Sequence, residues 1–176
     1  MRAVILAIAL LAPACAAART PYAGMQSRQI KALSDQQIGD LREGRGMGLA
    51  LVAELNGYPG PSHVLQLADK LALSPEQRSK VQEMFFAMKA ETMPIGASLI
   101  DQEGDLNRQF AGRTITAASL ASAISAISKT QGELRKAHLK YHLLSDAVLK
   151  QAQLAKYAEL RGYASNEPAQ PPHHQH

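Results

Sequence analysis

The feature that most constrains the fold is a long stretch beginning at Pro75 in which apolar residues recur at helical spacing. The spacing predicts one α-helix of about 35 residues and roughly 50 Å. Pro94 falls inside it and is expected to kink the helix, because proline removes one backbone hydrogen bond. The predicted buried face consists of Val81, Met84, Met88, Ile95, Leu99, Leu106 and Phe110.

A second stretch with the same pattern follows the break at residues 111–116, where Thr116 can cap a new helix. Its predicted buried face consists of Leu120, Ile124, Ile127, Leu134, His138, Tyr141 and Val148. Two long amphipathic helices joined by a short turn predict an antiparallel hairpin. Alternating strand-like runs are absent, so we predict an all-α fold with residues 63–163 as the helical hairpin domain.

Residues 19–62 form a region of short helices ahead of the hairpin. Ser34 and Gln37 have the spacing of a capping box, which predicts a short helix after Ser34. A second short helix is expected over Met47–Leu55, ended by an Asn-Gly pair. A third is expected over His63–Leu71, just inside the hairpin domain.

The first eighteen residues, MRAVILAIALLAPACAAA, have the layout of a cleaved secretory signal peptide, with a basic start, an apolar run and small residues after it. Its removal takes away Arg2 and lowers the net charge from +4 to +3. Cys15 sits in a faint lipoprotein-like box, but Leu11 is one place too far away, so ordinary cleavage is expected. The exported chain then has no cysteine for a disulfide, and a bacterial periplasm is the expected compartment.

Residues 164–176 are rich in proline and polar side chains, which predicts a disordered tail. Its histidines, His173, His174 and His176, form a possible metal site without geometric selectivity. A solvated tail with no such role is the alternative.

Three classes of function find no support in the residues. No Ser–His–Asp arrangement, cysteine nucleophile or acidic pair stands out, so we do not expect an enzyme. The glycines of GRGMG follow no strand and lack the Gly-Lys-Ser/Thr ending of a phosphate loop. The small positive charge forms no concentrated stripe, so no nucleic acid is expected as a partner.

The start of the first long helix reads LSPEQ, in which Leu73 precedes the cap Ser74 and Gln77 closes a capping box. By itself this capping-box pattern indicates only the start of a helix. Its position before a hairpin in an exported chain resembles the LTxxQ-motif periplasmic proteins, the group of Spy, CpxP, ZraP and the CnrX-type metal sensors. The second motif aligns with LKQAQ, which keeps Leu149 and Gln153 but has Lys150 in place of Thr. Lysine cannot cap, so the helix is expected to run through.

The resemblance implies an exported, all-helical homodimer that responds to envelope stress. Some members of the family hold unfolded proteins as ATP-independent, holdase-like chaperones. Others bind zinc, nickel or cobalt and report it to a membrane-bound sensor or anti-sigma partner. The resemblance therefore supports two competing roles, a chaperone first and a heavy-metal sensor or buffer as the alternative.

The sequence HLKYH places His138 and His142 four residues apart, on one face of the second long helix. With the turn centred near Thr114, Glu91 is expected opposite His138 and Met88 near His142. Two imidazoles, a carboxylate and a thioether suit zinc, nickel, cobalt or copper. The alternative is a hydrogen-bonded His138 at the helix interface and a solvated His142.

A cluster of methionine and phenylalanine on the first long helix is the candidate client-binding face. Two adjacent phenylalanines cannot face the same core, so Phe86 is expected to be partly exposed. Adaptable methionine-rich surfaces suit partners of varied shape. The alternative is a core or dimer interface. The cluster contains Met84, Phe85, Phe86, Met88 and Met93.

Overall fold

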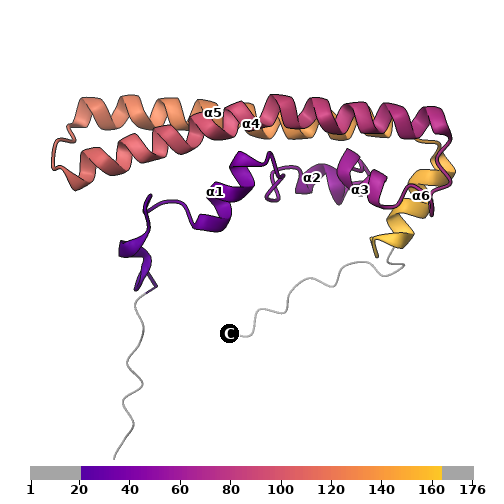
Figure 1. Cartoon of the computed structure of the whole chain (residues 1–176), viewed down its shortest axis with the longest axis horizontal. Helices are drawn as coiled ribbons and strands as arrows, with labels where there is room; N and C mark the ends of the chain where they lie inside the picture. The colour runs from indigo at the N-terminus through magenta and orange to yellow at the C-terminus, as the bar shows by residue number, and fades with distance from the viewer. Residues whose placement is uncertain (1–20, 164–176) are drawn as a thin grey trace, which may run out of the picture.

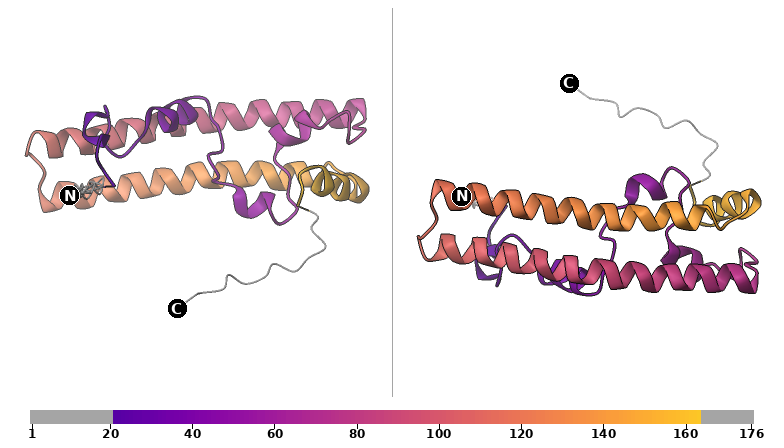
Figure 2. Two further views of the ribbon diagram at one scale, coloured as in Figure 1. Left: turned by 90° about the horizontal axis from the view of Figure 1, so that it is seen from below. Right: turned by 90° about the horizontal axis from the view of Figure 1, so that it is seen from above.

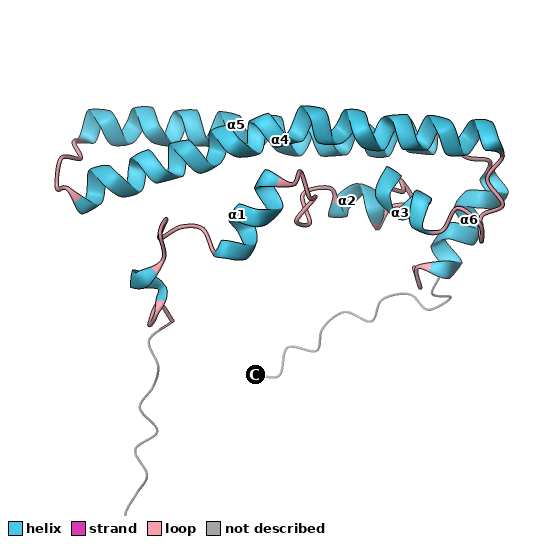
Figure 3. Cartoon of the chain, in the orientation of Figure 1, coloured by secondary structure: helices cyan, strands magenta, loops and turns pink. Residues whose placement is uncertain are grey.

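The computed structural model describes residues 21–163, and every regular element in that range is a helix (Figure 3). The all-α prediction is confirmed for this part of the chain. The predicted signal peptide, Cys15 and the tail histidines lie outside the described residues. The elements are η1 (Met25–Ser27), α1 (Asp35–Arg42), α2 (Leu51–Glu54), α3 (Pro61–Gln66), α4 (Pro75–Ala111), α5 (Ala117–Asp146) and α6 (Gln151–Leu160).

Helices α4 and α5 form the predicted antiparallel hairpin and set the length of the molecule (Figure 1). Ser74 caps α4 through a complete capping box with Gln77, and Thr116 caps α5 in the same way with Ser119. α4 has 37 residues and continues through Pro94, which is exposed to solvent. The local sequence signals therefore place both long helices correctly.

The register of the hairpin differs from the predicted one. Tyr141 donates a hydrogen bond to Glu91 over 2.9 Å, and Gln102 donates one to Thr130 over 3.0 Å. Both pairs are centred on Thr116 rather than Thr114, because α4 runs on to Ala111 and the turn includes residues up to the cap. Glu91 consequently faces Tyr141, not His138.

The N-terminal segment, residues 21–66, runs back along one face of the hairpin (Figure 1; Figure 2, left). α1 packs on α4, α2 lies against α5, and α3 contacts both long helices. The opposite face of the hairpin lies in front when the molecule is turned over (Figure 2, right). A hydrophobic core joins segment and hairpin, made of Ile30, Ile38, Leu41, Leu99, Ile100, Ile127 and Leu134.

Two of the short helices differ from their predicted bounds. Met47 and Gly48 have positive φ angles, so the chain turns there and α2 begins only at Leu51. α3 begins earlier than predicted, at Pro61, because proline fits the first helical position after Gly60. It ends at Gln66, before the predicted Leu71.

The side chains at the tip of the hairpin are exposed to solvent, so this part of the two predicted buried faces is wrong. Phe110 is 54% exposed, and Leu120 and Ile124 are also exposed. The core contributed by the N-terminal segment reaches Gly104 through Ile30 but does not cover the turn. Within residues 21–163, no helix combines the length and apolar character needed to cross a bilayer.

A second core closes the other end, where the chain breaks between α5 and α6 instead of running through LKQAQ. The prediction of a continuous helix is therefore wrong. Leu149 turns into this core, and the Lys150 N–H donates to Gln153 Oε1 over 2.9 Å to begin α6. The members of this core are Val64, Leu71, Val81, Leu149 and Tyr157.

The two aligned glutamines meet at this end and bind each other. Gln77 Nε2 donates to Gln153 Oε1 over 2.8 Å, and Gln153 Nε2 donates to Gln77 Oε1 over 3.0 Å. Gln77 Nε2 also donates to the Val148 carbonyl, and Gln153 Nε2 to the Leu71 carbonyl. The pair connects the start of α4 to the start of α6 and satisfies the hydrogen bonding of both half-buried amides.

Gly96 fixes how closely α1 approaches α4. A Cβ added at Gly96 would lie 3.0 Å from the Leu41 carbonyl carbon and closer still to its oxygen. The neighbour is backbone and cannot rotate away. A side chain at this position would push the N-terminal segment off the hairpin.

We therefore predict opposite effects for two helix-interior substitutions. Gly96→Ala should lower the free energy of unfolding by about 1–3 kcal/mol through overpacking. Gly132→Ala meets nothing within 4 Å and should raise it by about 0.5–1 kcal/mol, because alanine favours helix over glycine. Denaturant titration of both variants checks the pair. Equal stabilisation by the two substitutions would contradict the described packing.

Candidate functional site

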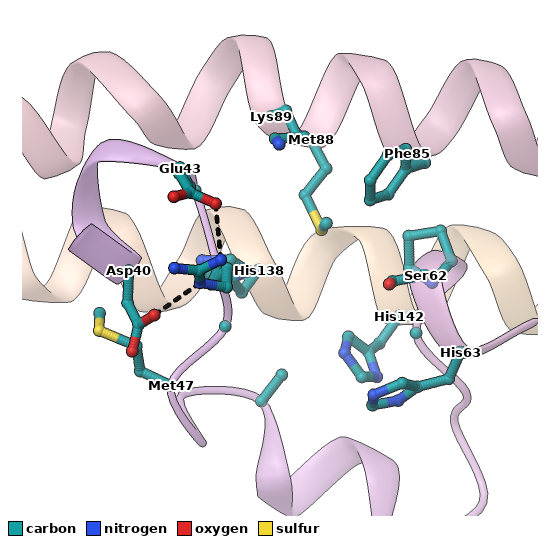
Figure 4. Close-up of a pocket in the computed structure, with 16 residues that line it drawn as sticks. Asp40, Glu43, Met47, Ser62, His63, Phe85, Met88, Lys89, His138 and His142 are labelled. Atoms are coloured by element: carbon teal, nitrogen blue, oxygen red, sulfur yellow. Dashed lines mark hydrogen bonds and ion pairs between the residues drawn. The ribbon is translucent and has the colours of Figure 1, made fainter. Parts of the chain in front are cut away.

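A cavity of about 510 Å³ lies between the N-terminal segment and the hairpin (Figure 4). The loop after α1 and the start of α3 form one side, and α4 and α5 form the other. His63, His138 and His142 all line it, together with the apolar side chains of Phe85 and Met88. It therefore gathers every histidine that lies within the described residues.

His138 is the most sheltered polar group of the cavity. The residue is 2% exposed, and its Nε2 has no hydrogen-bond partner in the described part of the chain. Burial, reinforced by the neighbouring His142, lowers the pKa of the His138 imidazole. The ring is therefore neutral at ordinary pH, and a neutral imidazole keeps one nitrogen with a free lone pair.

His142 is oriented by the backbone of the N-terminal segment. Its Nδ1 lies 2.7 Å from the Tyr58 carbonyl oxygen, which can only accept, so this nitrogen carries the proton. The lone pair of the ring is then on Nε2. Gly60 allows the chain to pass this ring, since a Cβ added there would lie 2.8 Å from His142 Nε2. The structure thus does not leave His142 solvated.

Met88 brings a sulfur atom to the same cavity from the facing helix. The residue is 7% exposed, and its side chain extends from α4 toward the space between His138 and His142 (Figure 4). A thioether is a weak hydrogen-bond acceptor but a good ligand for soft metal ions. Of the four predicted ligands, His138, His142 and Met88 are brought together.

Glu91 is not part of this group, which corrects the predicted ligand set. Its carboxylate is ion-paired with Lys140 and accepts the hydrogen bond of Tyr141. The Lys140 ammonium, against the opposing effect of burial, lowers the pKa of Glu91. Glu91 lines a separate hollow that includes neither histidine. The shifted register of the hairpin is the cause.

Sequence reasoning missed Glu54 and gave His63 no role. Glu54 is 5% exposed and lies beside two of the imidazoles, at 3.2 Å from His63 Nδ1 and 3.8 Å from His142 Nδ1. Burial alone would raise its pKa, but the adjacent His63 first, and the hydrogen bond from Tyr157 next, lower it to about 2. Glu54 stands alone among apolar residues in the sequence, so no motif could have indicated this role.

The imidazoles and the thioether share a cavity without converging on one point. Within residues 21–163, no three side chains of the His, Cys, Asp and Glu types are already gathered as metal ligands. What the cavity brings together is two imidazoles from adjacent turns of α5 and a sulfur atom from the facing helix α4.

The predicted client-binding cluster is divided between two environments. Phe85 and Met88 line the cavity, and Met88 is buried, so it offers no surface to a client. Phe86 is 59% exposed, as predicted, and Met93 is 41% exposed. Met84 is half-buried in a shallow hollow between α4 and α5.

Comparison of the chain with known proteins does not assign it to a family. No family model, no curated protein and no solved structure matches it. The LTxxQ resemblance accordingly remains one of motif and arrangement.

Proposed function

We propose that the protein binds a soft transition-metal ion, copper in preference to zinc, nickel or cobalt, in the cavity between the N-terminal segment and α5. The observation that carries this proposal is His138, a buried imidazole that lines the cavity and whose Nε2 has no hydrogen-bond partner within the described residues. An unsatisfied buried polar group costs about 1–3 kcal/mol. A metal ion would use the lone pair that the fold leaves free.

The neighbours of His138 supply the remaining chemistry. His142 lies one helical turn away, and its Nδ1 donates a hydrogen bond to the Tyr58 carbonyl. The lone pair that can bind a metal is therefore on Nε2. Imidazole suits copper, zinc and nickel, whereas the Met88 thioether favours copper, above all as Cu⁺. Copper is the ion that both ligand types accept.

The biological role that fits this chemistry is a periplasmic metal-stress protein. The signal-peptide pattern and the LTxxQ resemblance support export and a part in the envelope-stress response. In this role the protein buffers the metal or reports it to a membrane-bound partner. The homodimer expected from the resemblance stays a prediction.

The metal proposal is tested with the full chain carrying alanine at His173, His174 and His176, so that the tail does not contribute. Cu⁺ competition against a chromophoric chelator should show one ion bound at about micromolar affinity or tighter. Replacing His138 by Leu should weaken binding by about 100-fold or more. It should also leave the metal-free protein equally or more stable, because the unsatisfied nitrogen is gone.

A matched pair of methionine variants isolates the thioether. Met88→Leu should weaken Cu⁺ binding more than Zn²⁺ binding, whereas Met93→Leu, on the exposed surface, should change neither. Unchanged Cu⁺ affinity in the His138→Leu variant would refute the proposal.

A second candidate function is ATP-independent binding of unfolded proteins, favoured by the exposure of Phe86 and Met93 on α4. Exposed apolar side chains on a rigid helix can engage clients of varied sequence. Leu143 and Leu144 add exposed apolar surface on α5.

For this candidate we predict that the protein suppresses aggregation of a chemically reduced client without ATP. Phe86→Ser should remove most of that suppression. Phe110→Ser, a similarly exposed phenylalanine at the hairpin tip, should not. Light scattering at increasing molar ratios is the measurement. No suppression by the parent chain at molar excess would exclude a holdase role.

A further inference from the structure

We propose that His63 is a further ligand of the same ion and that Glu54 is the residue that positions it, so that the bound metal fastens the N-terminal segment to α5. The inference rests on the proposed metal function and assigns roles to two residues outside the ligand set predicted from the sequence. It also implies that metal binding strengthens the contact between the N-terminal segment and the hairpin.

The position of His63 suits it to bind the same ion. Its ring lies beside that of His142 at the edge of the cavity (Figure 4). Its Nδ1 is buried and lies 3.2 Å from Glu54 Oε1, a distance that allows an ion pair although the two atoms are not aligned as a hydrogen bond. With the proton on Nδ1, next to the carboxylate, Nε2 keeps its lone pair. The side chain of His63 is 38% exposed and lines the cavity, so its imidazole is accessible to an ion while Nδ1 stays beside Glu54.

Glu54 is held in place by several groups, so its carboxylate is a fixed neighbour for the Nδ1 of His63. Tyr157 donates its hydroxyl proton to Oε1, and the Gly60 N–H donates to Oε2 over 3.2 Å. Arg161 lies 3.5 Å from the same carboxylate. Tyr157 belongs to α6, Arg161 follows α6 directly and Gly60 precedes α3, so the carboxylate is fixed from two sides.

One fixed carboxylate next to two imidazoles is the arrangement that orients histidine ligands of metals. A carboxylate or carbonyl that accepts the Nδ1 proton sets the tautomer and raises the basicity of Nε2. Here the Tyr58 carbonyl performs this for His142, and the Glu54 carboxylate lies 3.2 Å from His63 Nδ1 and 3.8 Å from His142 Nδ1, where it favours a proton on both nitrogens. Within residues 21–163, His138 Nε2 has no partner of this kind.

The ligands would then come from three separate helices. His138 and His142 belong to α5, Met88 to α4 and His63 to α3. An ion bound by all of them closes the cavity and joins the N-terminal segment to the hairpin. Because Glu54 also anchors α6 through Tyr157, metal binding is linked to the docking of that helix as well.

The experiment uses the full chain with alanine at the three tail histidines, loaded with one equivalent of Cu²⁺. Pulsed electron paramagnetic resonance counts the imidazoles bound to the ion. We expect three in the parent and two in His63→Gln, which should bind about 10–100-fold more weakly. Glu54→Gln should show a loss of affinity of similar size, and Glu54→Asp should recover part of it.

Amide hydrogen exchange supplies the second readout. Metal should protect residues 54–66 from exchange in the parent but not in His63→Gln. An unchanged imidazole count in His63→Gln would overturn the inference while leaving the two-histidine site intact. If the parent itself binds no Cu²⁺ or Cu⁺, the proposed function fails and the inference fails with it.

Discussion

The structure depends on the contact between the N-terminal segment and the hairpin. A two-helix hairpin alone leaves one apolar face of each helix in water, and here residues 21–66 cover much of that face. The contact is close only because Gly96 lets the Leu41 backbone approach α4. Every wall of the cavity opposite α4 and α5 comes from this segment, so the seclusion of His138 follows from it.

The buried polar group around Glu54 depends on the same contact between the N-terminal segment and the hairpin. A buried carboxylate is costly unless hydrogen bonds and opposite charge compensate it. Glu54 receives donors from Gly60 and Tyr157, with the guanidinium of Arg161 nearby. The group thereby connects α2, α3 and α6 with the face of α5 that carries the histidines. The paired glutamines Gln77 and Gln153 close the same end of the molecule.

Features with local causes could be predicted from the sequence. The capping boxes at Ser34, Ser74 and Thr116 all form, and helical spacing correctly predicts two long antiparallel helices. The register could not be read to within one turn, since it depends on where the connecting turn ends. That small error moved Glu91 from His138 to Tyr141, whereas Met88, His138 and His142 still came together. The Glu54–His63 contact requires the chain to return over the hairpin, which no local pattern encodes.

The central claim is that the fold offers a metal ion both imidazole nitrogen and the Met88 sulfur within one sheltered cavity. X-ray absorption at the copper edge of the Cu⁺-loaded chain tests it most directly. The account predicts a nitrogen shell typical of imidazole plus one sulfur scatterer, at about the 2.3 Å usual for metal–sulfur bonds. The sulfur should disappear in Met88→Leu and persist in Met93→Leu. A shell of nitrogen and oxygen alone in the parent chain would contradict the claim.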